Sequence, residues 1–316
     1  MLSSLRVTPL QVVLQMQSTW TGPALKTLLL RSGLGFHLRR RECLTGAQQC
    51  AGCARQRECW YSFAFESPAD LLSGSALQRR DGQNAHPFYL ASAPIAQRIL
   101  PPGTDLPCLL TVFGQPEPLL SRLLWALEEA GISGKWGGAF RIRSVISPLR
   151  PSVRLSADGR SGREEDLQWP HWRVPPPRAV RGVRLRFLSP LRLRIQGTLV
   201  AQPSFPEIVR ALLRRIHILS GLYGSITPPA GWTLPLLEQA AQATPLTDSW
   251  SYFAEHRASG RQKRHIRIDG ICGEISLAGD LAGLWPFLDL CQWIGIGAST
   301  GHGLGAYVLD HYSGTE

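Results

Sequence analysis

Near the end of the chain, glycines recur in a pattern that few folds can use. Residues 295–305 read Gly-Ile-Gly, then five further residues, then Gly-Leu-Gly. We expect a helix before this segment and a strand after it, whereas a dinucleotide-binding fingerprint follows a strand and opens a helix. The Gly-Lys-Ser/Thr of a P-loop is also missing. Because glycines allow sharp turns and expose backbone amides, we expect this segment, called the glycine loop below, to contact a phosphate or sugar backbone.

The same order of strands and helices is expected twice along the chain. In the first half, strand-like and helical segments alternate at 5–17, 23–41, 108–113, 118–130 and 140–146. In the second half, the expected segments are a strand at 183–195, a helix at 205–222, a hairpin or bulged strand pair around Asp269-Gly270 within 266–277, a helix at 281–293 and a strand at 306–310. This β-α-β-α-β order is ferredoxin-like. We therefore predict an α+β fold of two tandem ferredoxin-like (RRM-like) domains, 1–147 and 179–316, joined by a proline-rich linker at 148–178.

The charge of the chain indicates an acidic partner. There are 34 Lys and Arg residues against 23 Asp and Glu, which gives a formal net charge of +11 and a pI near 9.8. Only three of the basic residues are lysines: Lys26, Lys135 and Lys263. The planar fork of arginine suits phosphates and stacks on bases, so this preference favours nucleic acid over a membrane surface, although a GC-rich genome also enriches arginine. No secretory or membrane segment is visible, and we expect a cytoplasmic protein without a membrane partner.

Four cysteines predict a metal site in an inserted segment at about 39–62. They follow the first helix with the spacing C-x6-C-x2-C-x5-C: Cys43, Cys50, Cys53 and Cys59. Four thiolates suit structural zinc, which is closed to water and does no chemistry. An iron–sulfur cluster uses the same ligands, and an unmetallated segment is the third alternative. We expect no catalytic metal.

These features together resemble the RAMP superfamily, and in particular its CRISPR repeat-processing endoribonucleases with a cysteine cluster near the N-terminus. The glycine loop is similar to the C-terminal loop of that superfamily. Further similar segments are Leu30-Arg-Ser-Gly-Leu-Gly35, Leu110-Thr-Val-Phe-Gly114 and Arg257-Ala-Ser-Gly-Arg-Gln-Lys263. Two positions depart from the pattern: His302 is the only ionisable residue in the loop, where relatives carry Lys or Arg, and Ala258 stands where an aromatic residue is expected.

The resemblance implies an activity and a partner. The partner is CRISPR repeat RNA or the processed guide, with other CRISPR effector subunits as further partners. The reaction is metal-independent transesterification, in which the ribose 2'-OH attacks the neighbouring phosphate and leaves 2',3'-cyclic phosphate and 5'-OH ends. Two other functions stay open. One is a non-catalytic RNA-binding subunit of an effector complex; the other is a metal-dependent nuclease, which the sequence disfavours because it lacks a carboxylate pair with metal-ligand spacing.

A histidine is the natural acid or base for this reaction, because its pKa lies near neutral pH. The resemblance places the catalytic residue on the first helix, where His37 stands. His37 lies about 120° from the centre of an apolar stripe formed by Leu25, Leu28, Leu29 and Phe36, so we expect it at the surface beside arginines. His265 and His302 are the reserve candidates.

The predicted RNA contacts come from four places. They are Arg41 on the first helix, the alternating arginines of the strand at 183–195, the basic segment before the hairpin, and the glycine loop. Period-two spacing is expected to place the four strand arginines on one face of the sheet. The full set is Arg41, Arg184, Arg186, Arg192, Arg194, Arg261, Lys263, Arg264, His265, Arg267, Gly295, Gly297, His302, Gly303 and Gly305.

Overall fold

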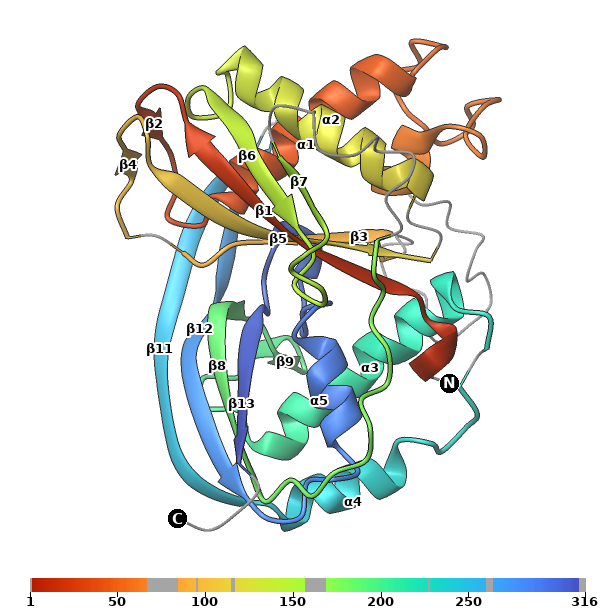
Figure 1. The fold of residues 1–316 in the computed structure, drawn as a ribbon, viewed down its shortest axis with the longest axis vertical. Coiled ribbons are helices and arrows are strands. Elements are labelled where there is room, and N and C mark those ends of the chain that lie inside the picture. Colours follow the sequence, from red (N-terminus) through yellow and green to blue (C-terminus); the bar gives the residue numbers. More distant parts are fainter. Residues whose placement is uncertain are drawn as a thin grey trace.

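Two antiparallel sheets follow one another along the chain in the computed structural model, each with helices on one face (Figure 1). The structure describes residues 2–66, 85–94, 96–114, 117–156, 169–226, 228–259 and 264–312. The first sheet has the strand order β3-β5-β1-β6-β7 and the second β11-β12-β8-β13. In each sheet the first strand of the unit lies between the third and the fourth, which is the ferredoxin-like arrangement, and β7 adds an edge strand to the first sheet. The predicted α+β fold class is confirmed.

The first unit contains β1 (Val7–Met16), α1 (Thr27–Glu42), β3 (Phe88–Ala91), β5 (Asp105–Phe113), α2 (Glu117–Ser133), β6 (Phe140–Ile146) and β7 (Arg154–Ser156). A short pair, β2 (Trp20–Thr21) and β4 (Ile99–Leu100), extends beside it, and the turns η1 (Leu2–Ser4) and η2 (Ser62–Glu66) flank it. The helices α1 and α2 pack side by side over the sheet (Figure 1). Their contact is close because Gly33 of α1 faces α2: a Cβ atom there would lie 2.8 Å from Cβ of Ala130.

The second unit contains β8 (Gly182–Leu191), α3 (Phe205–Tyr223), α4 (Leu234–Gln242), β11 (Thr244–Ser259), β12 (Arg264–Ala278), α5 (Trp285–Cys291) and β13 (Tyr307–Tyr312). The short strands β9 (Arg194–Ile195) and β10 (Thr198–Leu199) form a small hairpin, and η5 (Thr300–His302) is a turn in the glycine loop. The helix expected at 205–222 is confirmed by α3. It begins with a capping box, in which the Ser204 amide donates to Oε2 of Glu207 at 2.8 Å.

Both units contribute to one hydrophobic core. The largest buried cluster joins Val7, Tyr89 and Phe113 of the first unit to strands and helices of the second. Hydrogen bonds reinforce this contact: the Tyr89 hydroxyl donates to the Leu304 carbonyl at 3.1 Å, and the Thr111 hydroxyl donates to the Trp293 carbonyl at 2.6 Å. The two sheets therefore hold each other in place around the segment that connects α5 to β13.

Two segments differ from expectation. Of the two alternatives around Asp269-Gly270, the hairpin is wrong, because β12 runs through both residues and pairs with β11 along nearly its whole length. The pairing of β12 with β8 is instead interrupted by a register shift between Ile271 and Gly273. Gly270 is needed for packing, not for a turn: a Cβ there would lie 2.8 Å from Cβ of Pro190. Within 148–178, β7 pairs with β6, and Trp169 and Trp172 are buried.

Candidate nucleic-acid interface

A groove of about 640 Å³ lies between the tip of the glycine loop, α3 and the β9–β10 hairpin. Its walls carry five arginines, and Glu207 is the one carboxylate among the described lining residues. We call it the arginine groove; its arginines are Arg192, Arg194, Arg210, Arg214 and Arg215. An open groove with this excess of positive charge suits a polyanion.

Asp269 fixes two of these arginines beside the glycine loop. Nη2 of Arg192 lies 2.9 Å from Oδ1 of Asp269, and Nη2 of Arg194 lies 3.1 Å from its Oδ2. Burial raises the pKa of Asp269, but the two guanidinium groups outweigh it and hold that pKa below its usual value. Arg192 also donates to Oγ of Ser299 at 2.8 Å. The carboxylate is therefore ionised at neutral pH and holds both guanidinium groups, of which Arg192 reaches the loop and Arg194 donates to the Gly197 carbonyl of the β9–β10 hairpin.

The arginines of α3 have two different roles. Arg210 and Arg214 are exposed and stand one turn apart, so their side chains follow the same side of the helix. Arg215 is only 8% exposed, donates to the Ile294 carbonyl at 3.4 Å and lies over the ring of Phe113. Arg210 and Arg214 can therefore meet a ligand, whereas Arg215 supports the start of the glycine loop.

The glycines of the loop are required by protein contacts. Gly295, Gly303 and Gly305 are buried, with φ of +65°, +85° and +77°. A Cβ at Gly295 would lie 2.5 Å from the Tyr89 ring, and a Cβ at Gly305 would lie 1.8 Å from the Ile296 carbonyl oxygen. The amides of these three glycines donate to protein carbonyls. The prediction that they present bare amides to a phosphate is therefore wrong; their role is to let the backbone fold tightly against β3 and itself.

The tip of the loop, by contrast, reaches the arginine groove. Its lining residues are Gly297, Ala298, Ser299, Thr300 and Gly301. Only Gly297 of these belongs to the predicted set. His302 follows the tip, and its carbonyl accepts a hydrogen bond from the Thr27 hydroxyl of α1 at 3.0 Å.

His86 joins α1 to the wall of the groove. Its Nε2 lies 2.8 Å from Nη2 of Arg31, and because arginine only donates, this nitrogen is the acceptor. Burial lowers the pKa of His86 well below its usual value, and the Arg31 charge lowers it further. His86 is therefore a neutral imidazole that holds Arg31 beside the glycine loop.

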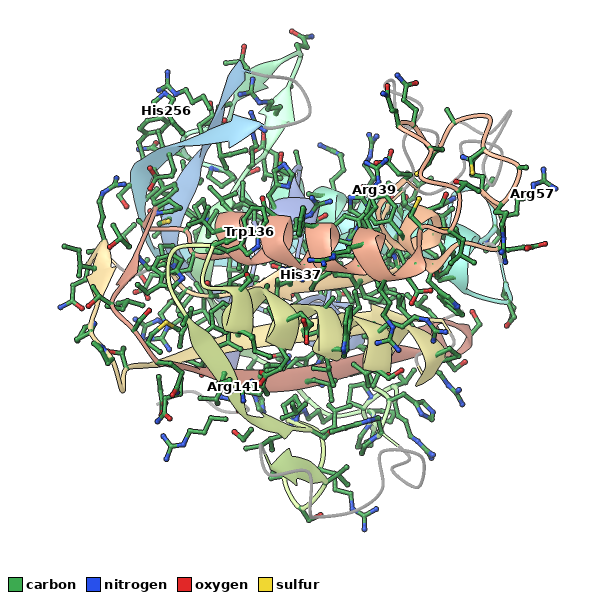
Figure 2. All side chains as sticks on the ribbon, turned by 90° about the horizontal axis from the view of Figure 1, so that it is seen from above. His37, Arg39, Arg57, Trp136, Arg141 and His256 are labelled. Atoms are coloured by element: carbon green, nitrogen blue, oxygen red, sulfur yellow. The ribbon has the colours of Figure 1, made fainter. Side chains whose placement is uncertain are left out.

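His37 lies on a different side of α1, where that helix runs along α2 (Figure 2). It is 6% exposed, so the expectation of a surface residue is wrong. The reason is that the helix buries Leu30, Leu34 and Leu38, whereas Phe36, assigned to the apolar stripe, is 48% exposed. At about 100° per residue, His37 lies about 120° around the helix from Arg31.

The surroundings of His37 lower its basicity. Burial lowers its pKa below the usual value, Glu129 raises it, and Arg40 and Lys135 lower it again. Among the described residues, no group hydrogen-bonds its buried Nε2 atom. His37 is therefore a neutral imidazole at pH 7, and its Nε2 has no hydrogen-bond partner within the described part of the chain.

The other predicted contacts lie apart from the groove. Arg184 and Arg186 are exposed on β8, and Arg184 pairs with Glu274 at 2.6 Å. The expectation that they share a face with Arg192 and Arg194 is wrong, because β8 ends at Leu191 and the chain turns into the β9–β10 hairpin.

Arg41 lies over the Trp125 ring at 4.4 Å, between α1 and α2, and Arg267 contacts Tyr252 on the β11–β12 pair. The predicted contacts Arg261 and Lys263 lie outside the described residues, as do the side chains of Arg264 and His265.

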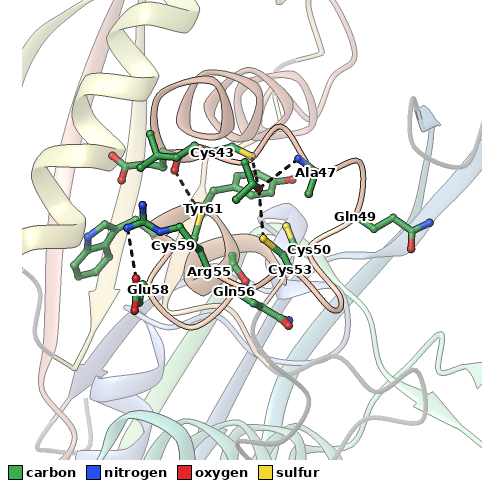
Figure 3. Close-up of a pocket in the computed structure, with 15 residues that line it drawn as sticks. Cys43, Ala47, Gln49, Cys50, Cys53, Arg55, Gln56, Glu58, Cys59 and Tyr61 are labelled. Carbon is green, nitrogen blue, oxygen red and sulfur yellow. Dashed lines mark hydrogen bonds and ion pairs between the residues drawn. The ribbon is translucent and has the colours of Figure 1, made fainter.

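The four cysteines gather around one cavity of about 240 Å³ beyond the end of α1 (Figure 3). The Thr45 hydroxyl lies 3.4 Å from Sγ of Cys53 and 4.0 Å from Sγ of Cys43. Burial raises the pKa of Cys50. Among the described residues, no three His, Cys, Asp or Glu side chains stand close enough together to ligate one ion. The donor types thus fit a thiolate-binding metal, and the thiols would have to move inward to hold it.

Sequence reasoning missed several residues of the groove. Arg210 and Arg214 carried a signal, since both fall off the apolar stripe of the helix at 205–222. Ser299 and Thr300 had no such signal in the sequence beyond their place in the glycine loop, and His86 had no signal at all.

None of the helices that the structure describes has the length and apolar character that a membrane span requires.

Comparisons with known proteins identify family profiles that match parts of the chain and solved structures that share its fold. Residues 185–307 match the profile of the family described as CRISPR-associated endoribonuclease Cas6, and residues 5–160 match a family described as an N-terminal domain. No curated protein matches the sequence.

Solved structures align over nearly the whole chain. A Cas6 product complex aligns with a TM-score of 0.56 at 16% identity, covering 96% of this chain and 99% of that one. Thermus thermophilus Cas6 aligns with a TM-score of 0.51 at 14% identity, covering 97% and 99%. A partial Cas6-RT-Cas1–Cas2 complex aligns with a TM-score of 0.60 at 11% identity, covering 99% of this chain but 47% of that one.

Proposed function

Because this chain belongs to the Cas6 family of CRISPR-associated endoribonucleases, we propose that it binds CRISPR repeat RNA and cuts precursor CRISPR RNA within its repeats to give mature guide RNAs. The observation that carries the proposal is the arginine groove, which the tip of the glycine loop closes on one side. The solved relative in a product complex supports the same activity.

The reaction is transesterification within the RNA. The ribose 2'-oxygen forms a bond to the adjacent phosphorus as the bond to the 5'-oxygen breaks, which leaves a 2',3'-cyclic phosphate and a 5'-OH. His37 accepts the 2'-OH proton once its ring turns the buried Nε2 toward the RNA, since its imidazole is neutral at pH 7 and no described residue hydrogen-bonds that atom. The departing 5'-oxygen takes a proton from water, which gives the 5'-OH. Arg40 and Lys135, which lie close enough to His37 to lower its pKa, offset the charge of the phosphorane, so the chemistry needs no metal ion.

The test is cleavage of a labelled repeat RNA in EDTA. We expect a single cut, an upstream fragment that cannot be labelled at its 3' end until the cyclic phosphate is removed, and a downstream fragment with a free 5'-OH. Tight, salt-sensitive binding of intact RNA would instead favour the non-catalytic RNA-binding subunit. Cleavage that requires added Mg²⁺ or Mn²⁺ would favour a metal-dependent nuclease.

We also propose that the four cysteines hold a structural zinc ion. The convergence of four thiols on one small cavity supports this, and no step of the reaction passes through the ion. We expect about one zinc per chain by elemental analysis in wild type, and its loss in Cys50→Ser/Cys53→Ser with a lower Tm and with RNA cleavage retained below that Tm. Cys272→Ser, which changes a half-buried thiol of β12, is the control and should keep the metal. A metal-free wild type with an unchanged Tm would contradict the proposal, and visible absorbance with bound iron would indicate an iron–sulfur cluster.

A further inference from the structure

Two aromatic rings lie at the edge of the α1–α2 pair, outside the arginine groove. Phe36 is 48% exposed, although it belongs to a helix that buries most of its apolar side chains. Its ring centroid lies 5.9 Å from that of the half-buried Trp136, with the ring planes tilted by 52°. Trp136 stands over the same stretch of α1 as His37 (Figure 2), and the ring of Phe36 contacts that of His37.

The position of Trp136 is set by glycines before and after it. Gly134 and Gly137 have φ of +64° and +102°, and a Cβ at Gly137 would lie 2.4 Å from the Trp20 ring. Within α1, a Cβ at Gly33 would lie 2.7 Å from Cδ1 of Trp136. The indole is therefore held in place before any ligand arrives, so binding costs little side-chain entropy.

The centre of this site is polar, and two cations and one carboxylate, Glu129, act on His37. His37 meets Phe36 edge-on at 5.1 Å and, at 6% exposure, points its Nε2 to no described partner. Arg40 and Lys135 are exposed beside it, and both are close enough to lower the pKa of His37. An apolar peptide would gain nothing from these charges, whereas a nucleotide has a flat base for the rings and a phosphate for the cations.

We propose that Phe36 and Trp136 form a stacking site for one nucleobase of the RNA, next to His37, with Arg40 and Lys135 facing the adjoining phosphates. This inference rests on the proposed function and adds to it a determinant of where the RNA is cut. The stacked base positions its own ribose and phosphate against the imidazole. Stacking tolerates any base, so the site selects an unpaired nucleotide and not a particular sequence.

The first test compares single-turnover cleavage of repeat RNA by Phe36 variants. Phe36→Ala and Phe36→Leu are expected to lose about tenfold or more in rate at subsaturating enzyme, and Phe36→Trp to restore it, because only an aromatic face stacks. The control is Ile132→Ala, which removes another exposed apolar side chain (52% exposed) at the end of α2 and should cut like wild type. Equal rates for all four variants would overturn the stacking site.

The second test does not depend on cleavage. Repeat RNA with a 2'-deoxy block at the cut site and 2-aminopurine at single positions should show quenched fluorescence at one position with wild type and Phe36→Trp, but not with Phe36→Ala. Quenching without any cleavage of unblocked RNA would support the stacking site and reject the proposed nuclease. Cleavage of unblocked RNA with no position quenched would support the proposed nuclease and reject the stacking site.

Discussion

Replacing His37 by alanine is expected to slow cleavage of repeat RNA by about 10²- to 10⁴-fold, the usual contribution of a positioned acid or base. Repeat affinity should stay close to wild type, because the imidazole is neutral and lies outside the arginine groove. Single-turnover rates and filter binding on the same RNA would measure the two effects separately. His256→Ala is the matched control, since His256 is an exposed histidine of β11.

The pH dependence gives this variant a second readout. Burial lowers the pKa of His37, so its neutral form predominates at pH 7. A general base works in its neutral form; the wild-type rate should therefore fall as pH decreases through this lowered pKa and level off above it. The residual cleavage rate of His37→Ala should not show this fall as the pH decreases. Unchanged cleavage by His37→Ala would exclude the assignment and leave His265 and His302 as candidates.

The double substitution Arg210→Gln/Arg214→Gln is expected to weaken repeat binding by about 10- to 100-fold, because it removes two positive charges from the arginine groove. The slope of log K against log salt should become shallower by about 0.7 for each phosphate of a single strand that the protein no longer neutralises. Binding titrations at several salt concentrations would measure both quantities.

A matched arginine control separates this effect from net charge. Arg184→Gln/Arg186→Gln removes the same charge from the exposed face of β8, away from the groove. Its affinity and salt slope should stay close to wild type. Equally weakened binding in the two double variants would mean that the RNA is attracted by overall charge and that the groove is not its site.

The fold could be predicted where one buried face dominates a segment. The stripe of α3 and the apolar run of β5 are of this kind, and both elements begin and end near the expected residues. Strand β11 escaped prediction because most of its described side chains are exposed, so no apolar period marks it. Its conformation comes from pairing with β12, which is a tertiary effect.

The site was harder to predict than the fold, because its residues meet only after packing. Asp269, Arg192 and Ser299 are far apart in sequence, and their contacts follow from the turn that ends β8. His37 was placed by an apolar stripe on the wrong side of α1. Three of its leucines are consecutive, Leu28 to Leu30, so their spacing alone does not reveal which side meets the sheet.

Tyr89 determines the backbone conformation of the glycine loop, whose tip closes the arginine groove. Its ring fills the space that any side chain at position 295 would need, and its hydroxyl binds the backbone at Leu304. If the chain were divided between the two sheets, the C-terminal fragment would therefore lack Tyr89, and its glycine loop would lose the side chain that holds its backbone. The turn that lines the arginine groove is therefore held by residues of both halves of the protein.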